Sequence, residues 1–211
     1  MGATSSKNME GKKNESIINT SPIIPIPDTV ITSTKSLCKI LAGNQVSSGF
    51  LIKLFKGDQD FFCLMTNEHI ITKDIIKNKE KIKFYYDNES KSKEINLNDK
   101  ERFIKEFTDD GLDITIIEIL SKDKIDERYF LLPCIDYMIN YEGLINKEIT
   151  IIQYPGGKLS YSNGIIKNIK NNEIIHLAST EPGSSGSPIF LKDTIKVIGI
   201  HKSGNKDNSE N

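Results

Sequence analysis

The 211-residue sequence lacks several features that would assign it to common functional classes. It has no excess of one charge, since 28 lysines and arginines stand against 29 aspartates and glutamates. Nucleic-acid-binding domains usually carry a clear basic surplus, so we expect no nucleic-acid partner. No stretch approaches the ~20 consecutive apolar residues that a membrane-spanning helix needs. A membrane-spanning chain is therefore not expected.

Cysteine is scarce as well. Cys38, Cys63 and Cys134 are too few and too scattered for a disulfide framework, and none lies in a CxxC pair. This usage is typical of a reducing compartment. The cysteines and the three histidines also lack the spacing of metal ligands, so we expect no metal and no organic cofactor. Apolar neighbours predict that Cys63 and Cys134 pack as small hydrophobic residues.

The first thirty residues lack the apolar run of a secretory signal peptide, so we expect a cytoplasmic protein that is not secreted by that route. The segment Met1-Gly2-Ala3-Thr4-Ser5-Ser6 matches the N-myristoylation pattern. Two interpretations stay open. A myristoylated Gly2, assisted by Lys7, Lys12 and Lys13, would give weak peripheral membrane contact. The alternative is a disordered polar tail without the lipid.

From Leu37 onward, short apolar or alternating runs dominate, and strands explain them better than helices. Each run is about four to eight residues long, rich in Ile and Phe, and bounded by turn-forming or charged residues. The polar stretch 87–101 is predicted to be a solvated loop. No long amphipathic helix and no internal repeat is visible, so the pattern favours all-β barrels or sandwiches. The expected strands are 38–41, 49–55, 61–66, 82–86, 114–120, 148–153, 164–169, 173–178, 187–191 and 195–201.

A serine within a turn of small residues is the clearest sign of chemistry. Ser185 lies in Pro182-Gly183-Ser184-Ser185-Gly186-Ser187-Pro188. Glycine permits a tight turn, and the backbone amides of Gly183 and Ser185 would face the oxyanion that forms when the hydroxyl attacks a carbonyl. Each such donor is typically worth ~3 kcal/mol. An ordinary turn between two strands can have the same composition, so the motif alone leaves both interpretations open.

A serine hydroxyl is a weak nucleophile until a base takes its proton. His69 follows an apolar strand and stands at the strand exit, where a side chain can face a cleft. His176 lies inside an apolar run, where a half-buried strand position explains it. Asp113 immediately precedes a predicted strand and is the preferred orienting acid. Two less constrained loop carboxylates come just before it, Asp109 and Asp110.

The order His69, Asp113, Ser185 resembles that of the trypsin-like serine peptidases, in which a threonine precedes the histidine by three residues, as Thr66 does here. The resemblance covers about Leu37 to Gly204. It implies two six-stranded antiparallel β-barrels of the chymotrypsin-like kind, with the active site between them. It also implies that Ser185 attacks, His69 transfers the proton, Asp113 orients the imidazole, and the amides of Gly183 and Ser185 bind the oxyanion. The supporting segments are Ser48–Ile52, Leu112–Ile116, Tyr154–Gly157 and Gly164–Ile166.

The segment Val197–Gly204, with Thr180, resembles the glutamyl endopeptidases and the picornavirus-type main proteases. This resemblance implies cleavage after Glu or Gln. Imidazole donates to a carboxylate when protonated and to an amide oxygen when neutral, so the choice stays open, as does a histidine that merely fills a strand. Some secreted glutamyl enzymes place a free terminal amine nearby, and the polar extension here departs from them. The implied substrate-binding residues are Thr180, His201, Ser203 and Gly204.

The sequence therefore predicts a serine endopeptidase acting on polypeptides. Its main rival is a catalytically silent trypsin-like fold that binds a peptide or protein. An esterase of the α/β-hydrolase kind is disfavoured, because its nucleophile turn requires a parallel sheet. The predicted segments are a disordered N-terminal extension (1–35), a first barrel with His69 and Asp113 (36–122), a connection (123–147), a second barrel with Ser185 and the pocket (148–204), and a tail (205–211).

Overall fold

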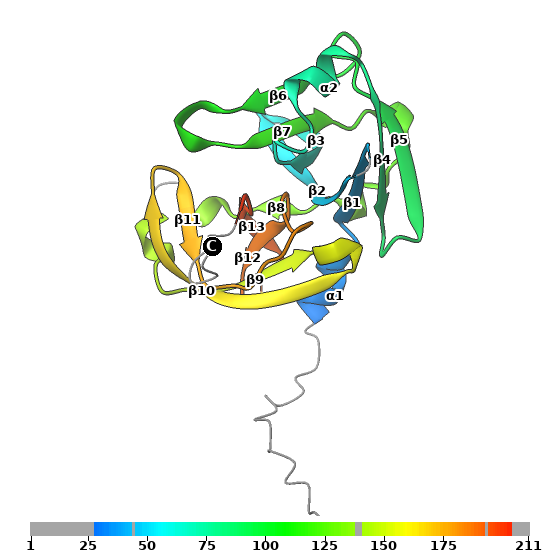
Figure 1. Ribbon diagram of the computed structural model, residues 1–211. Helices are drawn as coiled ribbons and strands as arrows, with labels where there is room; N and C mark the ends of the chain where they lie inside the picture. Colours follow the sequence, from blue (N-terminus) through cyan, green and yellow to red (C-terminus); the bar gives the residue numbers. More distant parts are fainter. Residues whose placement is uncertain (1–27, 44, 138–140, 193, 204–211) are drawn as a thin grey trace, which may run out of the picture.

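The computed structural model describes residues 28–43, 45–137, 141–192 and 194–203. Gly2, the lysines near it, and Gly204 lie outside these residues. The described chain forms two β-sheets, which occupy the upper and lower parts of the molecule in Figure 1. None of the described helices is long and apolar enough to span a bilayer.

The first sheet has seven strands. They are β1 (Leu37–Ala42), β2 (Gln45–Lys56), β3 (Gln59–Thr66), β4 (Lys81–Tyr86), β5 (Lys91–Asn96), β6 (Ile104–Phe107) and β7 (Ile114–Glu118). Their order is β5-β4-β1-β2-β3-β7-β6, and every neighbouring pair is antiparallel. Alternation builds the inner face, as in β4, where Ile82 and Phe84 are buried while Lys81 and Lys83 are exposed.

The second sheet has six strands in the order β11-β10-β9-β12-β13-β8. They are β8 (Leu132–Pro133), β9 (Glu148–Gln153), β10 (Ser160–Lys170), β11 (Glu173–His176), β12 (Pro188–Leu191) and β13 (Lys196–Ile200). All neighbours are antiparallel except β8, which pairs with β13 in parallel. The predicted all-β fold of two β-barrels is confirmed, except that the first sheet has seven strands rather than six and β8 is parallel to its neighbour.

Two local predictions are wrong. The polar stretch 87–101 is not all loop, because β5 forms in it as an edge strand. An edge strand can expose most of its side chains, and here Ile95 alone is fully turned into the core. The predicted disordered extension 1–35 is wrong at its end, where α1 (Asp28–Thr34) forms. Tertiary packing holds so short a helix, since Val30 is buried in an apolar cluster with Phe190.

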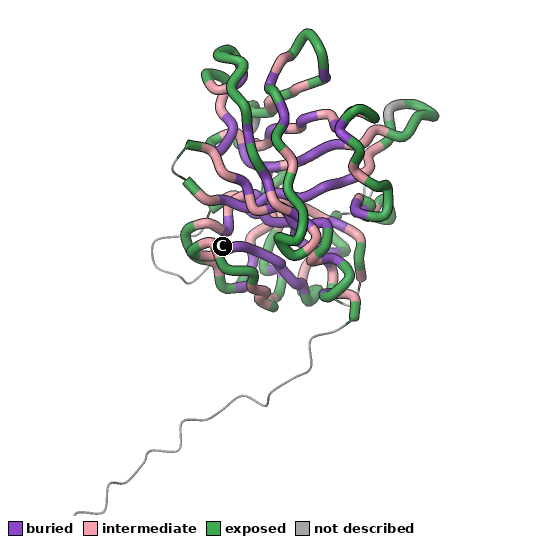
Figure 2. The backbone as a smooth tube through the Cα atoms, turned by 90° about the vertical axis from the view of Figure 1, so that its right-hand side faces the viewer, coloured by how far each residue is buried: buried purple, intermediate pink, exposed green. Residues whose placement is uncertain are grey.

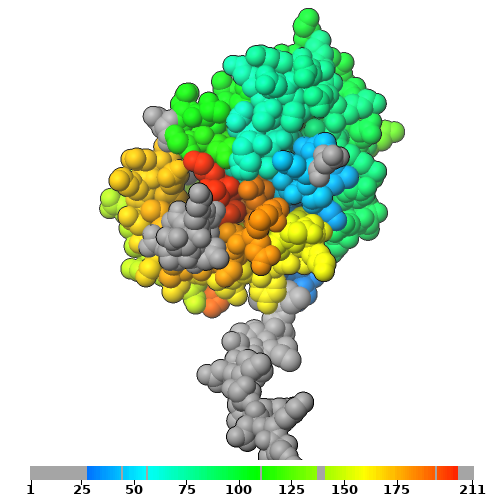
Figure 3. Space-filling model, in the orientation of Figure 1, coloured from blue at the N-terminus to red at the C-terminus, as the bar shows by residue number. Residues whose placement is uncertain are grey.

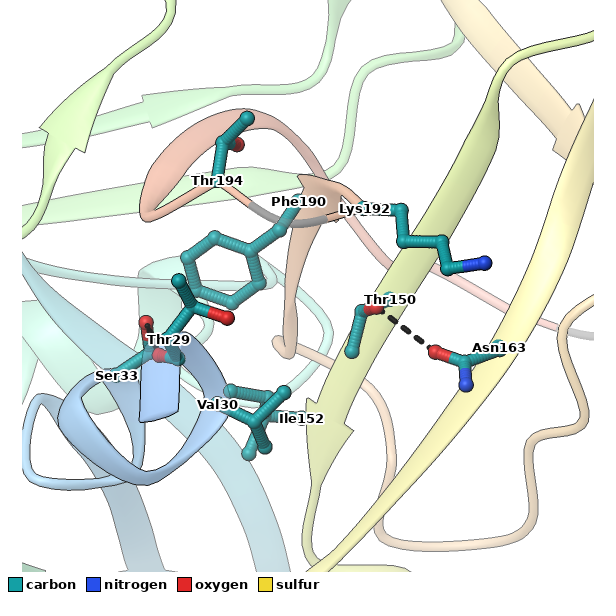
Figure 4. A pocket seen from close by; sticks show the side chains of 9 residues that line it. All are labelled: Thr29, Val30, Ser33, Thr150, Ile152, Asn163, Phe190, Lys192 and Thr194. Atoms are coloured by element: carbon teal, nitrogen blue, oxygen red, sulfur yellow. Dashed lines mark hydrogen bonds between the residues drawn. The ribbon is translucent and has the colours of Figure 1, made fainter. Parts of the chain in front are cut away.

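A small cavity of about 30 Å³ lies between α1 and the second sheet. Figure 4 shows Val30 and Ser33 of α1 facing Phe190, with the Thr150 hydroxyl donating to Asn163 Oδ1 at 2.8 Å on the opposite side. Its volume suffices for about one water molecule. The cavity is therefore a packing defect beside α1 and lies away from Ser185.

The remaining elements are short. The helix α2 (Lys73–Lys77) is capped by Thr72, whose hydroxyl accepts the Ile75 N–H at 3.4 Å. The 3-10 helices are η1 (Asp109–Gly111), η2 (Ser121–Asp123), η3 (Glu127–Tyr129), η4 (Ile135–Tyr137), η5 (Tyr141–Leu144) and η6 (Pro155–Gly157). The strands fall inside the predicted spans 36–122 and 148–204, apart from β8, which comes from the connecting segment.

An apolar cluster joins the two sheets, and Figure 2 shows the buried residues running through the middle of the molecule. It combines Phe50 and Ile52 of β2 with Tyr154, which follows β9, and Phe190 of β12. A second contact uses the isolated bridge between Ile52 and Leu131. The two halves therefore share a core, and side chains at their junction are held from both sides.

A buried ion pair fixes the start of the connection to the first sheet. Arg102 Nη1 lies 3.0 Å from Asp123 Oδ2, and the two side chains are only 4% and 8% exposed. Asp123 also accepts the Leu120 N–H at 2.7 Å, while Arg102 donates to the Glu118 carbonyl at 2.7 Å. These extra bonds supply part of the hydrogen bonding that a buried charge requires, although Arg102 Nε is buried without a partner among the described residues.

Candidate active site

His69 and Asp113 are in direct contact. His69 follows β3 and Asp113 precedes β7, and these strands are neighbours in the first sheet. The ring Nδ1 of His69 lies 2.6 Å from Asp113 Oδ2, and the backbone N–H of His69 donates to Asp113 Oδ1 at 3.0 Å. A carboxylate only accepts, so the ring proton lies on Nδ1 and leaves Nε2 free to accept another.

The environment keeps Asp113 ionised. Its side chain is 11% exposed, against 45% for His69. Burial alone would raise the pKa of Asp113, but hydrogen bonds from the ring and the backbone of His69 outweigh it and lower that pKa below its usual value. Asn67 adds a further bond, donating from Nδ2 to the Asp113 carbonyl oxygen at 2.7 Å. His69 therefore holds the carboxylate through both of its oxygens, and Asn67 holds the backbone of the same residue.

The other two carboxylates considered from the sequence are not part of this pair. Asp109 lies exposed in η1, four residues before Asp113. The side chain of Asp110 is outside what the structure describes. Among the described side chains, Asp113 is the carboxylate that contacts His69.

A tight turn precedes Ser185. The Ser184 N–H donates to the Glu181 carbonyl at 3.0 Å, and Pro182 and Gly183 occupy the two central positions. Gly183 has φ +101°, which a type II turn requires at its third position. A Cβ on Gly183 would lie 2.5 Å from the Tyr154 carbonyl oxygen, so neither the backbone angle nor the space admits another residue. This explains the Pro-Gly pair before the serine.

A second turn follows at once, closed by the Ser187 N–H donating to the Ser184 carbonyl at 3.1 Å. Its third residue, Gly186, has φ +87°, and a Cβ there would collide with the Ser48 carbonyl oxygen. Ser185 is therefore the second residue of a turn that directly follows another, and each of the two turns needs a glycine at its third position. Its backbone position is set by these turns rather than by a strand.

The backbone N–H groups of Gly183 and Ser185 have no acceptor within the described part of the chain. Two neighbouring unpaired donors beside a serine form a site for a negative oxygen. The two peptide groups that carry these donors are fixed, because the Pro182 carbonyl accepts the Gly156 N–H at 2.9 Å and the Ser184 carbonyl accepts the Ser187 N–H at 3.1 Å. The predicted donors thus occur together and are oriented.

Ser48, at which sequence reasoning assigned only a strand, is the residue that joins the two halves at the site. It is fully buried on β2. Its hydroxyl donates to the Gly183 carbonyl and accepts the Tyr154 N–H at 3.0 Å, while its own N–H donates to the Ser185 carbonyl at 3.0 Å. The available signal was a small polar residue beside Gly49, directly before the apolar run Phe50–Ile52.

The Ser185 hydroxyl itself donates to the Lys202 carbonyl oxygen at 3.2 Å. Within the described residues no hydrogen bond joins it to the His69 ring. The structure therefore brings His69 and Asp113 into contact and presents Ser185 beside free amides, with the serine side chain turned toward the second half.

Of the predicted substrate-binding residues, His201 is 4% exposed and lines a cavity of about 440 Å³. Ser203 lines the same cavity and is exposed. Thr180 is half-buried in the loop between β11 and β12. Asp113 lies on the opposite wall, so the cavity extends between the two halves. Figure 3 shows residues 200–203, in red, between first-half residues in green and second-half residues in orange.

His176 was predicted as a half-buried strand residue, and it does lie in β11, but it is 1% exposed. Its ring centroid is 5.5 Å from that of His201, and it lines the same cavity. Sequence reasoning missed this contact because β11 and β13 are not neighbours in the sheet order. The signal was the presence of two histidines in apolar strands of the same half.

Lys202 bridges the halves beside this cavity. Its Nζ donates to the Gly111 carbonyl of η1 at 2.8 Å and to Glu173 Oε1 of β11 at 3.2 Å.

The cysteines take no part in the site. Cys38, Cys63 and Cys134 are free thiols. Burial raises the pKa of Cys63 to about 12, so its thiolate is not accessible, as expected for a small hydrophobic residue. Cys134 is half-buried.

Residues 47–200 match the family of trypsin-like peptidase domains, and the chain belongs to that family. Among related proteins, the glutamyl endopeptidase of Staphylococcus aureus strain MW2 is 39% identical over 69 residues, a match covering 31% of this chain and 21% of that protein. The same enzyme from strain MSSA476 gives 39% over 69 residues and 20% of its length. The match thus spans about a fifth of these relatives.

Solved structures agree on the fold. The Rv3671c protease, inactive form, whose source is M. tuberculosis H37Rv, has a TM-score of 0.59 at 17% identity, covering 86% of this chain and 84% of that chain. Deg5 has a TM-score of 0.59 at 16% identity, covering 83% of both chains. At these identities the likeness shows the fold. The resemblance to trypsin-like peptidases inferred from the sequence is confirmed.

Proposed function

We propose that this chain is a serine endopeptidase that uses Ser185, His69 and Asp113 and cleaves after Glu or Gln. The observation that carries the proposal is the doubly hydrogen-bonded His69–Asp113 pair, together with a serine whose own N–H and that of Gly183 have no acceptor among the described residues. Family membership supports a peptidase, and the partial likeness to glutamyl endopeptidases supports the acyl-side preference.

In the proposed reaction, the Ser185 oxygen attacks the scissile carbonyl while His69 Nε2 takes its proton. The N–H groups of Gly183 and Ser185 bind the oxyanion, each worth ~3 kcal/mol in the transition state. His69 then protonates the leaving amine, and Asp113 stabilises the imidazolium formed on the way. Water repeats these steps on the acyl-enzyme and releases the acid product.

Attack requires Ser185 to leave the Lys202 carbonyl and turn toward His69. We propose that a change between staggered χ1 positions turns the hydroxyl toward His69. The observed rotamer also favours a second candidate function, a silent fold that binds a polypeptide without cleaving it. The two differ in one testable property, which is whether the Ser185 oxygen is nucleophilic.

Labelling with a fluorophosphonate tests this directly. We expect covalent modification of the wild type and of Ser90→Ala, a control on an exposed turn, and none of Ser185→Ala. A wild type that folds yet stays unlabelled would favour the silent fold. Mass-spectrometric mapping of cuts in a complex peptide mixture, with Ser185→Ala as the blank, then tests the preference. Cuts after Arg, Lys or large aromatic residues would contradict it.

A further inference from the structure

We propose that the pocket built on His201 selects glutamine over glutamate on the acyl side of the cleaved bond. The proposal rests on the proposed function and goes beyond it, because it assigns the charge state of the side chain that the pocket accepts. The proposed preference for glutamine also differs from the glutamate preference that the name of the related glutamyl endopeptidases indicates for those proteins.

The first step is the packing of two histidines with little access to water. His201 and His176 are 4% and 1% exposed, and their ring centroids lie 5.5 Å apart. Both line the cavity of about 440 Å³. Two imidazolium ions at this separation would repel each other while being deprived of hydration, so the neutral forms are favoured for both.

The second step is the hydrogen-bond form of His176. The backbone N–H of Ala178 donates to its Nδ1 at 3.2 Å, so Nδ1 accepts and the ring proton lies on Nε2. Burial lowers the pKa of His176 to about 4. Burial, followed by the neighbouring His176 and His69, also lowers the pKa of His201 to about 4. Near neutral pH both rings are uncharged.

The third step is the pairing of the other ionisable groups that line the cavity. Asp113 is bonded to His69, and Glu173 of β11 is paired with Lys202. Among the described lining residues, no cation is left without an anionic partner. A glutamate side chain entering this cavity would therefore meet a neutral donor and no compensating positive charge.

These three steps favour an amide. A neutral imidazole donates one N–H to an amide oxygen without burying a net charge. A carboxylate in the same place would be buried without a counter-charge unless it, or His201, first gained a proton. Glutamine and glutamate have nearly the same shape, so the selection rests on charge.

Competition between two peptides that differ only in Gln or Glu at the cleaved position tests the proposal. Near pH 7.5 we expect kcat/KM for the Gln peptide to be higher by about tenfold or more. Because both peptides share one enzyme sample, the ionisation of His69 cancels from the ratio. Equal cleavage or a preference for Glu would overturn the proposal.

The same ratio should depend on pH. As the pH falls toward about 5, a growing fraction of the Glu peptide, with a reference pKa of ~4.3, becomes neutral, and protonation of His201 begins to be accessible. The groups facing His201 are His176, His69, Asp113, Glu173 and Lys202. We expect the Gln-to-Glu ratio of kcat/KM to fall steadily as the pH is lowered. A constant ratio would mean that shape makes the selection, which contradicts the proposal.

A substitution can supply the missing charge. Glu173→Gln leaves Lys202 without its carboxylate partner at the cavity, so we expect the Gln-to-Glu ratio to fall several-fold. The matched control is Glu148→Gln, which frees Lys192 from a comparable exposed pair of 2.7 Å between β9 and the end of β12. The control should leave the ratio unchanged, and equal effects of both variants would overturn the proposal.

Binding separates this proposal from the proposed function. Ser185→Ala cannot cleave, so anisotropy of labelled Gln and Glu peptides on this variant reads the pocket alone. Tighter binding of the Gln peptide supports the pocket assignment even if the wild type is not labelled by fluorophosphonate. Binding of neither peptide, or tighter binding of the Glu peptide, overturns the pocket assignment even if the wild type is labelled.

Discussion

The two halves of the molecule bury polar side chains in opposite electrostatic states. The first half keeps charges in pairs, as Arg102 and Asp123 show with exposures of 4% and 8%. The second half buries His176 and His201 side by side, and neither forms an ion pair within the part of the chain that the structure describes. Burial penalises a charge equally in both places, so the partner decides the outcome. A group with an opposite charge stays ionised, and one beside its own kind becomes neutral.

The largest effect is expected at Asp113, the carboxylate of the first half that contacts His69. Asp113→Asn removes the negative charge and permits the wrong imidazole tautomer, so we expect kcat to fall by about 10⁴-fold. Peptide hydrolysis measured by burst and steady-state kinetics checks this. The unfolding temperature of the variant should change little. A fall in kcat of less than about tenfold would contradict the role of Asp113.

The next effect concerns the buried ion pair. Arg102→Met and Asp123→Leu each leave one buried charge unpaired, and we expect each to lower the free energy of unfolding by about 3–5 kcal/mol. The double substitution leaves no charge behind and should lie close to the wild type. Urea denaturation of all four proteins measures this. Additive losses in the double variant would show that packing, not charge pairing, governs the site.

The stability of the fold should depend on pH through the buried pair His176 and His201. Each folded-state pKa of about 4 lies below the ~6.5 of a free histidine, so the unfolded chain binds protons first as the pH falls. Stability from neutral burial is therefore complete above about pH 6.5 and is lost toward pH 4, by about 3 kcal/mol for each ring. His176→Phe should remove about half of that loss in urea denaturation. An unchanged pH dependence in this variant would contradict the neutral pair.

The smallest effect is expected at the joint between the halves. Ser48→Ala removes the acceptor of the Tyr154 N–H and the donor to the Gly183 carbonyl, so we expect a loss of about 2 kcal/mol in unfolding free energy. Fluorophosphonate labelling of Ser185 should also slow. Ser47→Ala, one residue away on β2 and also buried, is the control. A similar slowing in both variants would exclude a specific role for Ser48.

Local pattern sufficed for much of the fold. Alternation in β4 and the small-residue turn around Ser185 depend on neighbours in the chain, which a sequence displays. Local pattern failed at α1, which is held by packing on the distant strand β12, and at β5, which pairs with its neighbour β4 in a hairpin despite its polar composition.

The candidate site likewise contains some residues that the sequence identifies and others that it does not. His69 and Asp113 could be paired from the sequence because each stands at the end of a predicted strand. Ser48 and the contact between His176 and His201 could not, because they depend on how the halves dock and how β11 approaches β13. Sequence reasoning identified the candidate reacting groups, whereas the residues that position them emerged only from packing.

The bonds of Ser48 also bear on the order of events during folding. The turn carrying Gly183 and Ser185 is anchored to a residue of the first sheet, so the second half folding by itself would not complete that turn. We expect proteolytic competence to be the last property that the newly made chain acquires, after both cores have formed. Refolding can be followed by circular dichroism and by fluorophosphonate labelling, and we expect labelling to appear later than secondary structure. Such a delay would protect the unfinished chain from attack by its own copies.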